Sequence, residues 1–148
     1  MKINGTRTLE APVDKVWSFL MDPTAIAKVL PGCERLEEVE PDKFQATLQI
    51  GVAAVKGTYS GAVQMLDKTP PHSYRMLIDG SGAPGFVKGE ATVTLTPQDG
   101  QTMLSYDADA QVGGLIASVG QRIVGGAAKL IINQALKQLE EELAQYGG

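Results

Sequence analysis

The segment TMLSYDADAQVGGLIASVGQRIVGGAAKLIINQALKQLEEELAQY, residues 102–146, decides the fold of this chain. Its first part, 102–112, alternates as a β-strand does, and after a Gly-Gly pair the pattern is helical without interruption to the end of the segment. The predicted helix contains Gly120, Gly125 and Gly126, although each interior glycine costs roughly 0.8–1 kcal/mol relative to alanine. Close approach of another backbone or of a bulky ligand is the plainest compensation. We therefore expect a long helix that closes over a sheet and leaves a cavity between them.

The composition excludes several classes of protein. The length of 148 residues suits one domain, 1–148, with a single core. The net charge of -4 and the pI near 5.0 argue against a nucleic-acid-binding protein, which normally has a basic face. Cys33 is the only cysteine, so a reducing cytosol fits best. The first residues, MKINGTRTLE, lack the apolar core of a signal peptide, and we expect a cytoplasmic protein.

The rest of the chain predicts one antiparallel sheet. A short strand near 2–10 is followed by two short helices that end at Pro31-Gly32. Beyond them, apolar residues recur at every second position between turn signals, as in a sheet with one covered face. These strands are predicted near 33–40, 43–55, 57–68, 73–80, 86–96 and 102–112. The fold class is therefore α+β: a seven-stranded curved antiparallel sheet wrapped around a long C-terminal helix, the helix-grip fold.

The last helix carries two apolar stripes, where a simple surface helix has one. The first stripe is Leu115, Ile116, Val119, Ile123, Ala127 and Leu130, and the second is Ala128, Ile132, Ala135, Leu139 and Leu143. Both stripes can be core, and for Val119 and Ile123 core packing and cavity lining remain equal alternatives. The acidic residues 140–142 lie at the unfavourable end of the helix dipole, so we expect this tail to fray.

The candidate ligand-binding residues follow from strand alternation and helical phase. They are the residues expected on the inner faces of the sheet and of the long helix. They comprise Leu30, Leu48, Ile50, Tyr59, Met76, Phe86, Leu115, Val119, Gly120 and Ile123.

Three glycines, Gly80, Gly82 and Gly85, form the pattern GxGxxG. A dinucleotide-binding loop needs a helix after these glycines, whereas the residues that follow alternate as a strand. A turn between two strands is the simplest interpretation. The alternative is a mobile loop over a cavity mouth, with Phe86 as an apolar plug.

The polar residues offer little chemistry. His72 is the only histidine and lies in a predicted turn without neighbouring Cys or His ligands, and Cys33 has no histidine nearby to activate it. We therefore expect no catalytic residues, no metal site and no cofactor. The acidic run 34–42 is typical of a solvated hairpin, and a docking patch for a basic partner is the alternative.

Four segments together resemble the family of the G subunit of carbon monoxide dehydrogenase, within the START-like, birch-allergen-like (SRPBCC) superfamily. They are EAPVDKVWSFLMDP at 10–23, LPGCERLE at 30–37, GSGAPGFVKGEATVTL at 80–95 and YDADAQVGGLIASVGQRIV at 106–124. The resemblance covers essentially the whole chain. It implies a non-catalytic accessory protein of molybdenum-containing hydroxylases that handles an apolar ligand such as a quinone or lipid, with contact to the inner face of the membrane.

Two other functions remain open at this point. A cyclase- or hydrolase-like START relative would need acid and base groups that converge in the cavity. Tyr59, Tyr74, Asp79 and Lys88 are available for that role, but they form no recognisable pair in the sequence. A ligand-free interaction protein would instead have a filled core and would use the acidic hairpin or the glycine-rich helix to hold its partner.

Overall fold

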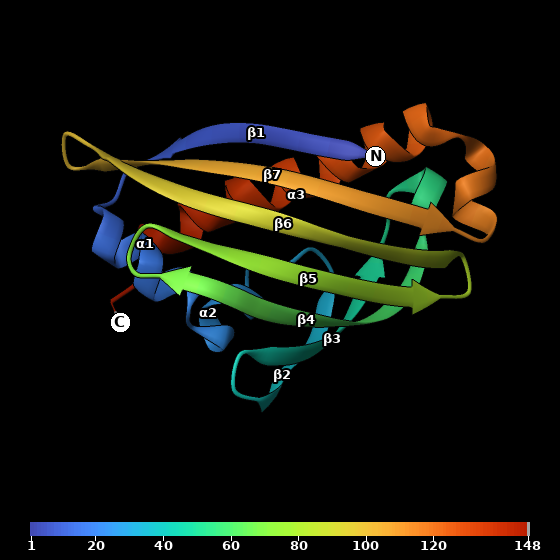
Figure 1. Ribbon diagram of the computed structural model, residues 1–148, viewed down its shortest axis with the longest axis horizontal. Helices are drawn as coiled ribbons and strands as arrows, with labels where there is room; N and C mark the ends of the chain where they lie inside the picture. The colour runs from blue at the N-terminus through green and yellow to red at the C-terminus, as the bar shows by residue number, and fades with distance from the viewer. Residues whose placement is uncertain (148) are drawn as a thin grey trace.

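The computed structural model describes residues 1–147, which form a seven-stranded antiparallel sheet with a long helix across one face (Figure 1). The strands are β1 (Lys2–Leu9), β2 (Cys33–Glu40), β3 (Lys43–Ile50), β4 (Gly57–Thr69), β5 (Ser73–Gly82), β6 (Gly85–Gln98) and β7 (Gln101–Gly113). The helices are α1 (Val13–Leu20), α2 (Pro23–Ala27) and α3 (Gln121–Leu143), with 3-10 turns η1 (Ala53–Val55) and η2 (Leu115–Val119). The strand order β1-β7-β6-β5-β4-β3-β2 places the first and last strands side by side and leaves β2 at the far edge. The predicted α+β fold class is confirmed.

Local signals in the sequence account for the two short helices. Residues at helical spacing in α1, among them Val16 and Phe19, are buried, so its apolar face packs on the sheet. Asp22 directly follows Met21, the C-cap of α1, and caps α2, because its Oδ1 accepts hydrogen bonds from the backbone N–H of Thr24 at 3.0 Å and of Ala25 at 3.4 Å. Such a cap satisfies N–H groups that have no partner inside the helix.

The apolar core is divided into two parts. The main cluster lies where α1, α2 and the C-terminal half of α3 meet the sheet, and Leu9, Val16, Phe19 and Leu95 are almost fully buried in it. A second, smaller cluster lies at the opposite end and is built on Val55, Ile116 and Ala127, from η1, η2 and α3.

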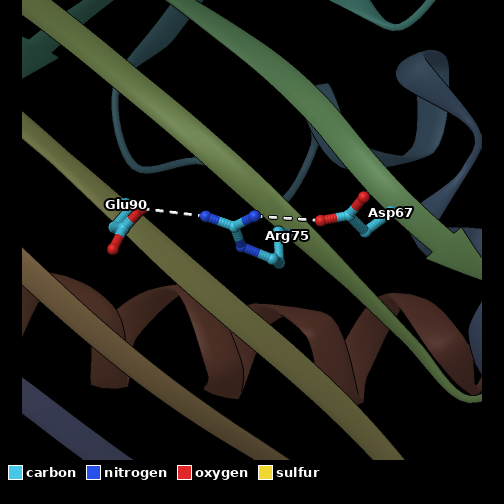
Figure 2. Close-up of polar contacts among 3 residues, drawn as sticks. All are labelled: Asp67, Arg75 and Glu90. Atoms are coloured by element: carbon cyan, nitrogen blue, oxygen red, sulfur yellow. Dashed lines mark hydrogen bonds and ion pairs between the residues drawn. The ribbon is translucent and has the colours of Figure 1, made fainter.

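The two faces of the sheet differ sharply in polarity. On the face away from α3, Arg75 of β5 reaches Asp67 of β4 and Glu90 of β6, with Nη1–Oδ2 and Nη2–Oε2 distances of 2.9 and 3.0 Å (Figure 2). The hydrogen bond to Asp67, followed by the one to Glu90, raises the pKa of Arg75. This outer face is solvated, so a site for an apolar molecule has to be sought on the inner face.

The strand predictions are confirmed with one local error. The strand expected to run to residue 55 ends at Ile50, and η1 follows. Gly51 interrupts the alternation, and Val55 turns inward to join the second cluster.

The uninterrupted helix predicted after residue 114 is wrong. Gly120 has φ +94° and ψ 148°, a conformation that essentially only glycine adopts without strain. The chain therefore forms the short turn η2, breaks at Gly120 and begins α3 at Gln121. The explanation by a close backbone also fails for the two remaining glycines. A Cβ at Gly125 would meet only Met1 Sδ, at 3.5 Å, and one at Gly126 would meet nothing within 4 Å.

The predicted fraying of the C-terminal tail is also wrong. Tyr146 packs edge-on against Phe19 with ring centroids 4.9 Å apart, and its hydroxyl lies 3.1 Å from Asp22 Oδ2 and 3.3 Å from Ser18 O. These contacts fix the end of the chain to α1. Helical phase alone carries no information about such long-range partners.

Candidate functional site

An apolar strip runs along the inner face of the sheet between the two core clusters. The same alternation that buries Tyr74 of β5 turns Met76 and Ile78 to the helix side. Met76 packs against the main cluster, whereas Ile78 and its cross-strand neighbour Val63 of β4 are only half-buried and belong to neither cluster. Leu48 of β3 lies on the same face, opposite Tyr59 of β4, and is also half-buried. These side chains point toward α3, yet they remain partly accessible to solvent.

Glycine leaves room at the end of this strip. A Cβ built on Gly80 would have its nearest neighbour, Ser60 O, at 4.0 Å, so a side chain could be accommodated there. The neighbouring Gly61 differs, because a Cβ on it would come 3.0 Å from Asp79 O. Gly80 is therefore a place where the absence of a side chain is not explained by the packing of the strands.

The long helix faces this strip without closing tightly on it. The principal contacts of α3 are with β1, α1, η1 and η2 rather than with the central strands, and in Figure 1 the helix crosses behind the sheet. Its half-buried Ala128, Ile132 and Ala135 lie on the core side of the helix.

Five of the predicted ligand-binding residues lie at or near the inner face. They are Leu30, Leu48, Ile50, Tyr59 and Met76, and all are half-buried. Ile50 also packs against the second cluster. Tyr59 donates a hydrogen bond to Val55 O at 2.6 Å, and burial raises the pKa of its hydroxyl. That hydroxyl is thus already used to hold η1 against β4.

The other predicted residues lie at the end of the molecule that carries η2. Leu115 is 72% exposed, Ile123 54%, Phe86 41% and Val119 39%, and Gly120 joins η2 to α3. Phe86 lies on β6 and shares the exposed outer face with Lys88 and Glu90, so its predicted inward direction is wrong by the strand alternation itself. The helical phase assigned to Leu115, Val119 and Ile123 assumes a continuous helix, and the break at Gly120 invalidates that phase.

A surface groove of about 480 Å³ joins two of these predicted residues. It lies between the end of β7 and the start of α3, and its lining includes Met1, Phe86, Val112, Ala117, Gly120 and Val124. The phenyl ring of Phe86 covers Gly113 so closely that a Cβ there would overlap Cε1 of the ring. The groove is thus open to solvent and partly apolar.

Sequence reasoning misses Met1, which lines this groove, and Ile116, which anchors the adjoining turn η2. Met1 is held in place because its ammonium donates to Ala110 O at 2.9 Å and lies 3.6 Å from Asp109 Oδ1. Ile116, which the sequence places on an apolar stripe but not in the site, is the buried anchor of η2. Its N–H donates to Pro84 O at 2.8 Å. The LIASV run is a usable signal for Ile116, whereas nothing in the sequence marks Met1.

The GxGxxG segment is a tight strand-to-strand turn, as predicted. β5 ends at Gly82 and β6 begins at Gly85, so only two residues separate the strands. A Cβ on Gly82 would overlap Thr58 O, and Gly85 has φ +142°. Close strand packing and backbone conformation therefore account for these two glycines.

The polar residues weighed for an enzyme do not converge. Tyr74 is 4% exposed and packs edge-on against Trp17 inside the core, where burial raises the pKa of its hydroxyl. Asp79 and Lys88 lie opposite each other in the register of β5 and β6, and both are exposed. His72 is exposed in its turn, and Cys33 is half-buried at the start of β2.

The antiparallel sheet, the short helices after β1 and the long C-terminal helix define a START-like fold. A START superfamily protein from Mycobacterium smegmatis shares it with a TM-score of 0.78, at 15% identity over 97% of each chain. The chain itself belongs to the family of the carbon monoxide dehydrogenase G subunit (CoxG), whose family model matches residues 5–144. The resemblance inferred from the sequence motifs is therefore confirmed.

Other solved structures agree with this assignment. A conserved protein from Geobacillus kaustophilus is 44% identical, with a TM-score of 0.95 over 98% of this chain and 96% of that one. A protein from Chromobacterium violaceum is 23% identical with a TM-score of 0.73 over 95% of each chain. Comparison with curated proteins found no match. Within residues 1–147, no helix is both long and apolar enough to cross a membrane.

Proposed function

We propose that this protein is a non-catalytic accessory protein that binds an apolar, quinone- or lipid-like molecule between the sheet and α3. It passes this molecule between a membrane and a molybdenum-hydroxylase-type enzyme related to carbon monoxide dehydrogenase. The family supports the class of partner. The observation that carries the proposal is the half-buried apolar strip of Leu48, Val63 and Ile78, which faces α3 but belongs to neither core cluster.

Covering this strip with an apolar molecule lowers the free energy. Removal of apolar surface from water contributes roughly 25 cal/mol per Å², so an apolar molecule placed against the strip is stabilised together with the side chains beneath it. Small-molecule sites are typically concave and mostly apolar, with few polar groups. Phe86, Leu115, Val119, Gly120 and Ile123 would then lie at the mouth rather than in the depth of the site.

Tryptophan fluorescence offers a direct test. Trp17 is the only tryptophan, and it packs against the main cluster with its ring centroid 5.8 Å from that of Tyr74. A short-chain quinone added without membranes is expected to quench this fluorescence in a saturable way. Gly80→Leu should fill the space beside the strip and weaken binding at least about tenfold, the effect of roughly 1.4 kcal/mol.

Ser81→Leu is the matched control. It adds the same side chain one residue further along β5, but on the opposite face of the sheet, where Ser81 is exposed. Its quinone affinity should equal that of the wild type. Absence of saturable quenching in the wild type, or an equal loss in both variants, would refute the ligand site and favour the ligand-free interaction protein.

The partner is tested separately. The protein should co-migrate in size-exclusion chromatography with a carbon monoxide dehydrogenase-type enzyme from the same organism. If the protein binds quinone but never this enzyme, the carrier role needs a different partner.

A further inference from the structure

Tyr74 of β5 is 4% exposed, and its hydroxyl makes no hydrogen bond to any of residues 1–147. The hydroxyl groups that do donate such a bond belong to Tyr59, Thr102, Ser118 and Tyr146. A buried tyrosine hydroxyl normally has a partner, because its removal from water otherwise costs free energy. Tyr74 therefore carries a donor that the packing of residues 1–147 does not use.

The hydroxyl of Tyr74 is not sealed inside the core. Every fully buried side-chain nitrogen or oxygen within residues 1–147 has a hydrogen-bond partner, so a hydroxyl without one must keep some accessible surface. The ring itself is enclosed, since it belongs to the main cluster and packs edge-on against Trp17 with the ring centroids 5.8 Å apart. The small exposed fraction of Tyr74 thus includes its polar tip.

The strand pairing leaves space beside this tyrosine. On the β6 side, the buried Val93 lies directly opposite Tyr74. On the β4 side none of the described residues is registered with it, because the pairing is irregular between residues 66 and 69. Both residues inside this irregularity are exposed, and one of them, Asp67, bonds to Arg75 on the outer face (Figure 2). Tyr74 therefore has a cross-strand neighbour on one side only.

Tyr74 lies in line with the apolar strip. Alternate residues of a strand share a face, and on β5 the residues of the inner face are Tyr74, Met76, Ile78 and Gly80. Tyr74 stands at the end of this row next to the main cluster, and the open position at Gly80 lies at the other end. A molecule that lies along the strip from Gly80 would meet Tyr74 as the first polar side chain of this row.

The central strands of the described sheet present no charged side chain to a ligand on their inner face. In β3 to β7 the charged residues lie on the outer face or in the irregularity of β4. Arg7 of β1 does face α3, but it is already paired with Glu140. An ionised carboxylate brought to the strip would be buried without a cation, at a high cost in free energy. The hydroxyl of Tyr74 itself stays protonated, because burial raises its pKa, and it can therefore donate.

From this arrangement we propose that Tyr74 determines the specificity of the site, because its hydroxyl donates a hydrogen bond to a neutral oxygen, such as that of a carbonyl group, on the bound apolar molecule. The inference rests on the proposed function, since it requires a ligand on the apolar strip. It narrows the ligand class to apolar molecules that carry such an oxygen, in preference to plain hydrocarbons. A site that bonds an oxygen discriminates against a molecule without one, because the buried donor is then left unpaired.

Duroquinone and durene are a matched pair of probes, because both have a methylated six-membered ring and only duroquinone carries carbonyl groups. Their affinities are measured by equilibrium dialysis in the absence of membranes. The wild type should bind duroquinone more tightly than durene. Tyr74→Phe removes only the hydroxyl, so it should weaken duroquinone binding about three- to tenfold, the effect of one hydrogen bond. Its affinity for durene should equal that of the wild type.

Tyr146→Phe is the control variant. The hydroxyl of Tyr146 is bonded to Ser18 O and Asp22 Oδ2, so this variant should have a lower urea midpoint than the wild type and unchanged affinities for both probes. Tyr74→Phe should show the reverse. Its urea midpoint without ligand should be no lower than that of the wild type, because it loses no hydrogen bond to residues 1–147.

The outcomes separate this inference from the proposed function. Equal weakening of both probes by Tyr74→Phe, or no change in either, would overturn the role of the hydroxyl while the ligand site stands. So would equal affinity of the wild type for duroquinone and durene. A lower urea midpoint for Tyr74→Phe would also overturn it, since the hydroxyl would then have a partner inside the fold. If the wild type binds neither probe, the inference and the proposed function both fail.

Discussion

Arg7 on β1 holds Glu140 on α3 through two hydrogen bonds, with an Nε–Oε1 distance of 2.7 Å and an Nη2–Oε2 distance of 3.2 Å. The two residues are 133 positions apart in the sequence. Arg7 shares the inner face of β1 with the buried Ile3 and Leu9, so the pair fixes the C-terminal half of the helix to the edge of the sheet.

This ion pair should make the stability of the protein depend on pH. The hydrogen bond from Arg7 lowers the pKa of Glu140 in the folded protein. The stabilisation is therefore complete above the unfolded pKa of glutamate, about 4.3, and disappears as the pH falls through the lower folded value. Both side chains are partly exposed, so Glu140→Gln should cost about 0.2–1 kcal/mol at neutral pH.

Urea denaturation of the wild type and of Glu140→Gln measures this difference. The two curves should be separated at neutral pH and should converge in acid below the folded pKa of Glu140. A separation that stays constant through the acidic range would mean that the side chain acts through packing and not through its charge.

The strands could be predicted from the sequence because successive side chains of a strand point to opposite faces, so apolar residues recur at every second position when one face is buried. Ala91, Val93 and Leu95 of β6 are buried, and the residues between them are exposed. The neighbours in the sheet follow from short turns, such as the two residues between Gly82 and Gly85. A meander of short connections leaves few other topologies.

The break in the last helix could not be predicted in the same way. Glycine is compatible with a helix and with a left-handed residue, and the choice at Gly120 depends on Ile116 being anchored beneath the β5–β6 turn. If the helix is taken as continuous, with about 3.6 residues per turn, Leu115 and Ile123 fall on one inward face. Both side chains are in fact exposed. The side-chain direction could thus be predicted on β3, as with Leu48, but not at Phe86 of β6 and not beyond the break.

Replacement of Gly126 and of Gly120 by alanine should have opposite effects on stability. Gly126 lies in a regular helix and a Cβ there meets nothing within 4 Å, so Gly126→Ala should stabilise the protein by about 0.4–1 kcal/mol. Gly120 has equally open surroundings but φ +94°, so Gly120→Ala should destabilise by about 1–3 kcal/mol. Thermal melts of the two variants compare them directly, and a stabilised Gly120→Ala would show that the chain can continue as one helix.

Asp22 should prove more important to stability than its place in a short connection suggests. One carboxylate oxygen caps α2 and the other accepts the hydrogen bond of Tyr146. Tyr146→Phe keeps the cap but removes the contact to Asp22 and the hydroxyl's contact to Ser18 O, and it should cost about 0.5–1.5 kcal/mol at most. Asp22→Ala removes both contacts and should cost about 1 kcal/mol more, the usual contribution of a helix cap. Equal free energies of unfolding for the two variants would mean that the cap contributes nothing.

Ile116 and Leu115 are adjacent in η2 but should respond differently to truncation. Ile116 is 4% exposed and packs with Val55 and Ala127, so Ile116→Ala should cost about 2–5 kcal/mol as a buried cavity forms. Leu115 is 72% exposed, so Leu115→Ala should change the free energy of unfolding by less than about 0.5 kcal/mol. Denaturant titration of both variants makes the comparison.

Because η2 contacts η1, β6 and β7, hydrogen exchange in the Ile116→Ala variant should rise first at the N–H of residue 116, which is bonded to Pro84 O. Unchanged exchange there, together with a small loss of stability, would mean that Ile116 is not the anchor that turns its neighbours toward solvent.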